Sequence, residues 1–353
     1  MNDMEVARDE RRRSLRFKTI FCLILVISII SLMCVSIVVG AAKSVTIGYS
    51  FKVLVNQILP GTFEVPDNVV KIVENIRLPR VYMALFAGII LALGGTIMQT
   101  LMNNPLATPY TLGISSAASF GACLALAFGI NLASSTLAVA TNAFLFSLLP
   151  LGIIMLCAKV RRMSPVMIVL MGVAISYIFN ALLTIMEYFV DSDVLSSVVF
   201  WTVGDLSHAF MWQIKYVAIA AVILLIFTVL MSKPLNIMRM GDDTAKSLGV
   251  NVDTVRLVCI MAACLGTALV ISFIGTIGFV CLLAPQICRY IIGGELKGLA
   301  VSSALMGAVI LLVADILSKY LVDPALLPVG AVTALIGGPV LVLLLVKAKG
   351  VDS

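Results

Sequence analysis

The feature that most constrains this chain is one long apolar stretch, because Leu257 to Cys288 carries no charged side chain over 32 residues. A helix needs only about 20 apolar residues to cross a bilayer, so this stretch is too long for a single crossing. Gly275, Gly278 and Pro285 offer places where a helix can break. We expect one span that ends near Gly275 and a second, broken span over 277–292.

Comparable apolar runs recur along the chain. Hydrophobic residues make up 61% of the sequence and charged residues 12%, whereas about 25% of the residues of a soluble domain are charged. This composition excludes a cytosolic globular enzyme, a disordered chain and a nucleic-acid-binding domain. We expect an all-α integral membrane protein in which residues 1–353 form a single transmembrane domain. Its spans, about ten in number, are expected over residues 19–42, 80–102, 110–129, 135–158, 165–189, 212–231, 255–275, 277–292, 298–320 and 327–346.

The first apolar run follows a basic segment, residues 1–18. A secretory signal peptide shows the same order of charge and apolarity. The run over 19–42 is longer than the apolar region of a signal peptide, and Gly40-Ala41-Ala42 is only a weak cleavage site. We therefore favour a retained first span and a cytoplasmic N-terminus.

The distribution of basic residues agrees with ten spans and two cytoplasmic termini. Cytoplasmic loops of membrane proteins are enriched in Lys and Arg, and this arrangement places 17 of the 24 Lys and Arg residues inside. It makes residues 232–253 a cytoplasmic loop. It places seven basic residues outside the cell membrane: Lys43, Lys52, Lys71, Arg77, Arg80, Lys215 and Lys319.

Signatures of catalysis and metal binding are missing from the sequence. The eight cysteines form no CxxC pair and His208 is the only histidine, so we expect no metal site. Neither GxxxxGKS nor GxxxxGKT occurs, so the chain has no P-loop with which to bind ATP. If ATP drives transport here, another subunit must hydrolyse it.

Polar side chains form a stripe on the expected span 165–189. Side chains three and four residues apart share one face of a helix, and a polar face on an apolar helix turns away from lipid. Such a face either lines a transport pathway or is hydrogen-bonded inside a helix bundle, and both interpretations stay open. The stripe consists of Gly172, Ser176, Asn180, Thr184 and Glu187.

Asp315 lies in the expected span 298–320, where a carboxylate is costly and marks a functional candidate. Lys319 follows four residues later on the same helix face, which favours an ion pair. We therefore favour a structural or mouth-facing ion pair over a proton relay.

Two segments depart from regular helix. Residues 94–113 combine several glycines with two prolines, so they form either unwound backbone facing protein or a water-filled path, or an ordinary turn between spans. In the loop 232–253, Asp242 can cap the start of a short helix and Gly249 can end it. That helix is either a docking element for a partner or part of a solvated loop.

Taken together, these segments resemble the permeases of binding-protein-dependent ABC importers for iron–siderophore, haem and cobalamin, the FecCD-like type II importers. The resemblance covers roughly residues 20–348 and rests on the order and spacing of several motifs. The motifs are Arg77-Leu78-Pro79-Arg80, Gln99 with Asn104-Pro105-Leu106-Ala107 and Leu112-Gly113, Trp201-Thr202-Val203-Gly204, the loop from Gly241 to Gly249, Gly278-Phe279 through Ala284-Pro285 to Arg289, Ala314-Asp315, and Leu327-Pro328-Val329-Gly330 through Gly337-Gly338-Pro339.

The resemblance implies a homodimer with one central pathway, two ATPase subunits docked inside and an extracytoplasmic binding protein docked outside. It implies that this chain is a transport subunit without enzymatic activity, and that ATP and Mg²⁺ bind to the ATPase subunits. It assigns docking of the binding protein to Arg77, Arg80 and Lys319. It assigns the cytoplasmic gate to Asn104, Pro105, Leu106, Ser164, Pro165 and Val166. It assigns coupling to the ATPase to Gly241, Asp242, Asp243, Thr244, Ala245, Leu248 and Gly249. The candidates for the pathway are Gln99, Ser176, Asn180, Thr184 and Trp201.

The family resemblance implies a metal chelate as substrate, with iron–siderophore first on family frequency and haem or cobalamin as the other choices. The chain departs from the family at Gln286, where relatives usually carry histidine, so any role of that histidine is in doubt here. A paralogue in place of an identical second chain stays open. The main functional alternative is an ion-gradient-driven secondary transporter that uses Asp315 and Glu187. A membrane prenyltransferase is a third choice, but Asp242-Asp243 has no second acidic motif beside it.

Overall fold

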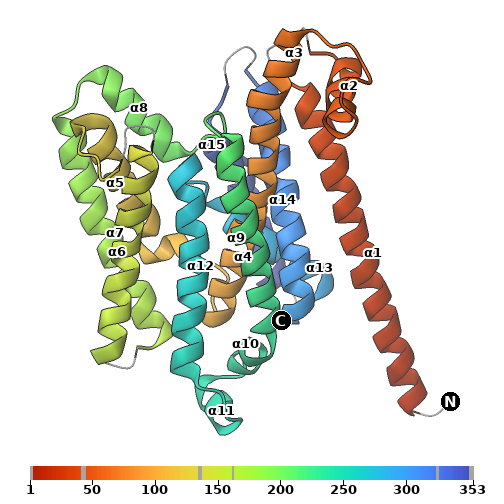
Figure 1. Cartoon of the computed structure of the whole chain (residues 1–353). Helices are drawn as coiled ribbons and strands as arrows, with labels where there is room; N and C mark the ends of the chain where they lie inside the picture. Colours follow the sequence, from red (N-terminus) through yellow and green to blue (C-terminus); the bar gives the residue numbers. More distant parts are fainter. Residues whose placement is uncertain (1–2, 41–44, 134–136, 161–162, 323–325, 350–353) are drawn as a thin grey trace.

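The computed structural model describes residues 3–40, 45–133, 137–160, 163–322 and 326–349. The described chain is helical, and its long helices run roughly side by side (Figure 1). In chain order the helices are α1 (Asp3–Val38), α2 (Ile47–Ile58), α3 (Asp67–Ile72), the π-helical turn η1 (Val73–Arg77), α4 (Leu78–Leu101), the 3-10 turn η2 (Pro109–Leu112), α5 (Ile114–Phe128), α6 (Ala138–Val160), α7 (Pro165–Tyr188), α8 (Ser192–Val203), α9 (Met211–Leu230), α10 (Ser232–Met238), α11 (Asp242–Ser247), α12 (Val252–Ile274), α13 (Phe279–Ile292), α14 (Leu296–Tyr320) and α15 (Val329–Lys349).

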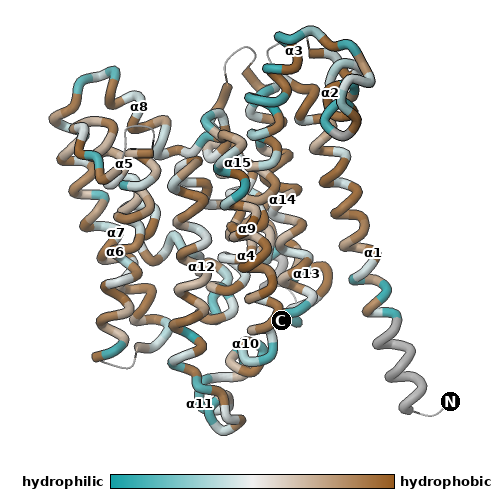
Figure 2. The backbone as a smooth tube through the Cα atoms, viewed as in Figure 1, coloured by the Kyte–Doolittle hydropathy of each residue, from teal (hydrophilic) through white to brown (hydrophobic). Residues whose placement is uncertain are grey.

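The expected spans agree with these helices. Seven described helical segments are long and apolar enough to cross a membrane: 13–38, 67–101, 138–160, 165–188, 211–230, 252–274 and 296–320. The other three expected spans correspond to apolar helices that are shorter than this criterion requires, namely α5, α13 and α15, the last searched over 329–344. Figure 2 shows hydrophobic residues along the long helices and hydrophilic residues concentrated toward their ends. The chain is an all-helical membrane protein, as predicted.

The long apolar stretch divides where the sequence indicated. α12 ends at Ile274, and Gly275 follows with a φ of 71°, a conformation that glycine adopts without steric cost. α13 begins at Phe279, so the two helices are separated by a short connection. Pro285 does not mark the break, because it lies inside α13.

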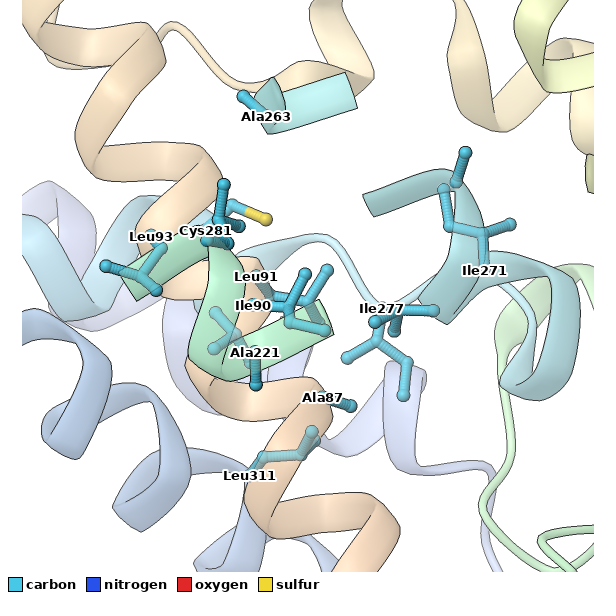
Figure 3. Close-up of a cluster of buried hydrophobic side chains, with 14 of the residues drawn as sticks. Ala87, Ile90, Leu91, Leu93, Ala221, Ala263, Ile271, Ile277, Cys281 and Leu311 are labelled. Atoms are coloured by element: carbon cyan, nitrogen blue, oxygen red, sulfur yellow. The ribbon is translucent and has the colours of Figure 1, made fainter. Parts of the chain in front are cut away.

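The centre of the bundle is α4, which is packed against α9, α12, α13 and α14. Its apolar side chains are buried together with side chains from these neighbours, as the close-up around Ile90 and Leu91 shows (Figure 3). Two glycines bring backbones into direct contact. A Cβ atom added at Gly88 would lie 2.4 Å from the carbonyl oxygen of Gly307 on α14, and one at Gly95 would lie 1.8 Å from that of Cys281 on α13. Small residues therefore set how closely α4 meets its partners.

The two ends of the bundle differ. α2, α3 and α8 lie at one end, which we call the α3 end, and α10 and α11 lie at the other, which we call the α11 end (Figure 1). α4 and α14 run between the two ends, so each presents its termini to both. α1 lies at one edge of the bundle and α7 at the opposite edge (Figure 1).

Candidate functional sites

Charged side chains meet at the α3 end, where α1, α4 and α14 converge. Asp315 on α14 is their centre and is fully buried. Its Oδ2 accepts hydrogen bonds from Lys319 Nζ at 2.6 Å and from Ser36 Oγ at 2.6 Å, and its Oδ1 accepts one from Arg80 Nε. One carboxylate therefore pairs with two cations and a hydroxyl. We call Ser36, Arg77, Arg80, Asp315 and Lys319 the charged cluster.

The remaining donors of the charged cluster bind the end of α1 and neighbouring hydroxyls. Arg77 donates to the carbonyls of Ile37 and Val38, both at 2.6 Å. These carbonyls lie at the C-terminus of α1, where a helix lacks donors of its own. Arg80 donates to Ser318 Oγ at 3.0 Å and to Ser207 Oγ. The cluster thus joins α1, α4 and α14 to the loop after α8.

The structure brings together all three residues predicted to dock a binding protein, but it buries them. Arg77, Arg80 and Lys319 are 5%, 4% and 7% exposed. The predicted ion pair between Asp315 and Lys319 is confirmed. Burial requires such pairing, because an isolated charge inside protein is costly. The docking role stays a prediction, since any carboxylate that approaches these cations meets an already occupied network.

The cluster reaches the surface through the loop between α8 and α9. Asp205 Oδ1 lies 3.9 Å from Arg80, and the Asp205 side chain is 22% exposed. Ser207, which Arg80 also binds, is exposed, and its hydroxyl donates to Asp205 Oδ1 at 3.1 Å. No described hydrogen bond or ion pair links Asp315 to Glu187, the second acid of the ion-coupled alternative.

The first predicted gate segment follows α4. Asn103 has a φ of 47°, which is uncommon outside glycine, and it turns the chain out of the helix. Asn104 Oδ1 then accepts the backbone N–H of Leu106 at 2.9 Å, an Asx-type turn. Leu106 is 46% exposed. Pro105 lies between them, and its carbonyl accepts a hydrogen bond from Gln286 at 3.2 Å. The segment is therefore an irregular loop. The stretch 94–113, expected to depart from regular helix, does so only from residue 102 on, because residues 94–101 belong to α4.

The second predicted gate segment begins α7. Ser164 caps this helix, because its Oγ accepts the backbone N–H of Met167 at 3.3 Å. Pro165 occupies the first helical position, where its missing N–H costs nothing. Val166 is 67% exposed. Both segments expose one apolar side chain.

The predicted coupling loop forms the short helix α11, which projects at the tip of the bundle (Figure 1). Gly249 has a φ of 82° and donates to the Lys246 carbonyl, while Val250 donates to the Ala245 carbonyl, so the helix ends in a Schellman motif as expected. Ala245 is buried and Leu248 is 60% exposed.

The predicted start of α11 is wrong by one residue. Gly241, with a φ of 109°, precedes the helix, and Asp242 is its first residue without capping it. The Asp242 carboxylate instead accepts two hydrogen bonds from Arg256, at 2.7 and 2.9 Å. Both hydrogen bonds come from Nη2 of Arg256, which is buried in the second turn of α12, so this charge-assisted contact ties α11 to the bundle. Asp243 and Thr244 belong to the same first turn.

The pathway candidates are dispersed over several elements. Gln99 is 1% exposed near the end of α4. On α7 the stripe is packed at one end and open at the other: Gly172 abuts the backbone of Thr111 and Leu112, Ser176 is half-buried, and Asn180 and Thr184 are exposed. The hydroxyl of Ser176 donates to the Gly172 carbonyl of its own helix at 2.8 Å. Within the described residues, the exposed part of the stripe faces away from the bundle.

Trp201 on α8 lines a cavity of about 560 Å³ at the α3 end. Aromatic side chains contribute much of its wall, and its polar groups are Ser197, Asp205, His208, Gln213 and Ser272. The cavity lies among α5, α6, α8, α9 and α12, whereas the α7 stripe lies at the edge of the bundle. The structure therefore does not join Trp201 to Asn180 and Thr184 in one cavity.

Sequence reasoning missed two contributors. Ser36 joins the charged cluster from α1, and no motif marked it. Gln286 binds both Gln99 and the Pro105 carbonyl. Its departure from the family's usual histidine was a signal that something differs at this position, but the contacts could not be read from it.

Comparison with known proteins identifies the family. A model of the FecCD transport family matches residues 24–347. The hemin transport system permease protein HmuU of Yersinia pestis is 34% identical over 330 residues, which cover 92% of this chain and 96% of that protein. MJ0087 of Methanocaldococcus jannaschii, named as an ABC transporter permease, is 39% identical over 307 residues, which cover 84% of this chain and 88% of that protein.

A solved structure supports the same assignment. It is described as an inward-facing conformation of a metal-chelate type ABC transporter, and it matches with a TM-score of 0.80 and 26% identity over 92% of this chain and 98% of that chain. Neither the ion-coupled transporter nor the prenyltransferase agrees with these matches. The chain belongs to the FecCD transport family and is the permease subunit of an ABC transporter.

Proposed function

We propose that this permease imports a metal chelate across the cytoplasmic membrane by alternating access, as one of two copies around a central pathway. Iron–siderophore is our first choice of substrate, with haem and cobalamin as the others, and the name of HmuU supports this class. Both termini lie in the cytoplasm in this proposal, so the α11 end is cytoplasmic and the α3 end faces outward. In this proposal Asp315 has a structural role in the charged cluster and does not couple transport to an ion gradient.

The observation that carries the proposal is the form of α11. This short helix projects from the α11 end, is anchored by the hydrogen-bonded ion pair of Asp242 with Arg256, and exposes Leu248. An anchored helix with an exposed apolar side chain suits insertion into a partner's cleft. We infer that a dimer of ATPase subunits, which bind ATP and Mg²⁺, docks here and moves the permease through α11.

The exposed stripe of α7 supports the second copy. Asn180 and Thr184 face away from the bundle of their own chain, although polar groups avoid lipid. A second permease chain against this edge gives these residues a protein or water-filled surrounding. We infer that they line the pathway, together with Ser176, and that Gln99 and Trp201 contribute from the interior.

The charged cluster supports docking of a binding protein at the α3 end. Arg77, Arg80 and Lys319 outnumber Asp315, so the cluster carries excess positive charge even with Asp205 nearby. We infer that acidic side chains of the binding protein approach through Ser207 and Asp205, the exposed side of this network, and that electrostatic attraction aids the encounter.

The testing experiment replaces the exposed side chain on α11. We expect Leu248→Glu to reduce co-purification of the ATPase at least about tenfold, because buried interface anchors contribute roughly 2 kcal/mol or more, and to abolish uptake of haemin, an iron(III) hydroxamate or cobalamin, whichever the wild type takes up. Lys233→Glu, an exposed charge reversal on α10, is the control and retains both. Normal ATPase binding and uptake with Leu248→Glu would remove α11 from the proposal.

A further inference from the structure

Two glutamine side chains form a small hydrogen-bonded group where α4, α13 and the following loop meet. Gln99 lies near the end of α4 and Gln286 lies on α13. Gln286 Nε2 donates to Gln99 Oε1 at 2.8 Å and to the Pro105 carbonyl at 3.2 Å. Gln99 Nε2 donates to the Cys281 and Leu282 carbonyls at 3.3 and 3.4 Å. We call Gln99 and Gln286, with these three carbonyls, the amide cluster.

The cluster exists because of Pro285. A proline inside a helix has no N–H, so the carbonyl four residues earlier loses its helical donor. In α13 that carbonyl belongs to Cys281. Gln99 supplies the missing hydrogen bond, and it can reach because Gly95, one turn earlier on α4, lets the two backbones touch. The proline inside α13 and the close approach of α4 therefore create the position of Gln99.

The donors of the cluster match its acceptors. A glutamine amide has two N–H groups and one carbonyl oxygen. Both donors of Gln99 are directed at α13, so only its Oε1 can take a further hydrogen bond, and Gln286 provides it. The second N–H of Gln286 is directed at Pro105. A residue at 286 thus needs two donors at once to hold both Gln99 and the loop.

The loop over residues 102–108 has few other described hydrogen bonds to distant parts of the chain, although Met102 and Ala107 pack in the core. Its remaining described hydrogen bonds run to groups within residues 98–111, chiefly through Asn104 and Thr108. Among the described residues, Gln286 is the side chain from a distant part of the sequence that donates to this loop. Met102, Ala107 and Thr108 are buried, whereas Asn103, Asn104 and Leu106 are exposed. The exposed turn over residues 103–106 therefore has its described hydrogen bond to α13 through one amide group, that of Gln286.

We propose that Gln286 is the latch of this loop: by donating to Gln99 Oε1 and to the Pro105 carbonyl together, it holds residues 102–108 against α13. Its importance for transport rests on the proposed gate role of Asn104, Pro105 and Leu106. An amide latch suits a gate, because a neutral hydrogen bond can be exchanged for one to water at modest cost. Gln286 is a positioning residue in this scheme and need not contact substrate.

The latch is tested by hydrogen exchange of the full-length chain in lipid nanodiscs. Gln286→Leu keeps the size of the side chain and removes both donors. We expect amides of residues 102–108 to exchange about tenfold faster or more, since two hydrogen bonds of ordinary strength are lost, while α12 keeps its protection. Gln213→Leu is the matched control, because it removes a buried amide that caps α9 instead. Unchanged exchange over 102–108 in Gln286→Leu would overturn the latch.

A second variant gives a response that a packing role does not predict. Gln286→Glu carries acceptors only when ionised, but one donor when protonated. At alkaline pH we expect the amides of residues 102–108 to exchange faster in this variant than in wild type at the same pH. As the pH falls, the difference between the two exchange rates is expected to become smaller. A pH-independent difference would contradict the latch, even if Gln286→Leu proves unstable.

Passive release of substrate probes tests the gate role of residues 104–106 separately from the latch role of Gln286. Proteoliposomes that contain the permease are loaded with haemin or with an iron(III) hydroxamate, and release without ATP is measured. We expect faster release with Gln286→Leu than with wild type. If residues 102–108 exchange faster in Gln286→Leu but neither probe is released faster, the latch role of Gln286 is supported and the gate role of residues 104–106 is overturned.

Discussion

α4 is held at both ends by polar groups, but the two ends use different chemistry. Near its start, Arg80 enters the charged cluster with Asp315 and Lys319. Near its end, Gln99 enters the amide cluster with Gln286. Removing one member of a buried ion network leaves an uncompensated charge, whereas breaking an amide hydrogen bond leaves only neutral groups, which cost less to leave unpaired. The comparison suggests that the α3 end is fixed and that the end beside the loop over residues 102–108 can switch.

The largest expected effect comes from removing the negative charge of the charged cluster. Asp315→Asn keeps the shape but leaves Arg80 and Lys319 without their shared carboxylate. We expect the free energy of unfolding to fall by about 3–5 kcal/mol, because two buried cations lose their partner. Denaturant unfolding of the purified chain in mild detergent measures this loss.

A double variant shows whether charge is the cause. Asp315→Asn with Lys319→Met removes one carboxylate and one ammonium, so we expect it to recover part of the lost stability. A double variant that is less stable than Asp315→Asn alone would show that packing, and not charge balance, dominates the α3 end.

A smaller effect is expected at the close approach that precedes the amide cluster. In Gly95→Ala the new Cβ would lie 1.8 Å from the Cys281 carbonyl oxygen, so α4 and α13 must separate. We expect a loss of about 1–3 kcal/mol, the usual cost of overpacking, and faster hydrogen exchange of residues 102–108. Gly152→Ala on α6, where the Cβ meets nothing within 4 Å, is the control. Equal stability of the two variants would argue against a dependence of the amide cluster on this contact.

The smallest effect is expected for a charged pair that is not buried. Lys18 Nζ lies 3.3 Å from Glu295 Oε2, and the two side chains are 23% and 52% exposed. We expect Lys18→Met to change the free energy of unfolding by no more than about 1 kcal/mol, because exposed pairs are screened by solvent. A loss as large as that of Asp315→Asn would mean that charge alone, without burial, explains the α3 end.

Much of the fold could be predicted from the sequence, and the errors have local causes. Hydropathy identified the spans, and the break after α12 was found because Gly275 tolerates a positive φ. The start of α11 was misplaced because Asp242 was read as a cap, whereas Arg256, fourteen positions later, takes its carboxylate. A capping rule considers only neighbouring residues, and here a tertiary contact prevails.

In the candidate sites, too, contacts between neighbouring residues could be predicted and contacts between distant residues could not. The spacing of Asp315 and Lys319 sufficed to predict their pair, since both lie on one face of one helix. Burial of Arg77 and Arg80 could not be predicted, because it depends on the end of α1 and on α14. Arg80 and Asp315 are 235 positions apart, and Gln99 and Gln286 are 187 apart.

The sequence by itself determined that this chain is a helical membrane protein, where its spans lie, and to which family it belongs, because apolar length, turn residues and motif order are local properties of the chain. Only the tertiary structure decided that Arg77, Arg80 and Lys319 are hydrogen-bonded and buried, and that Gln286 reaches the Pro105 carbonyl. Those outcomes depend on how closely the helices approach one another. Gly88 and Gly95 permit a close approach, but the distance is set only once α14 and α13 pack against them.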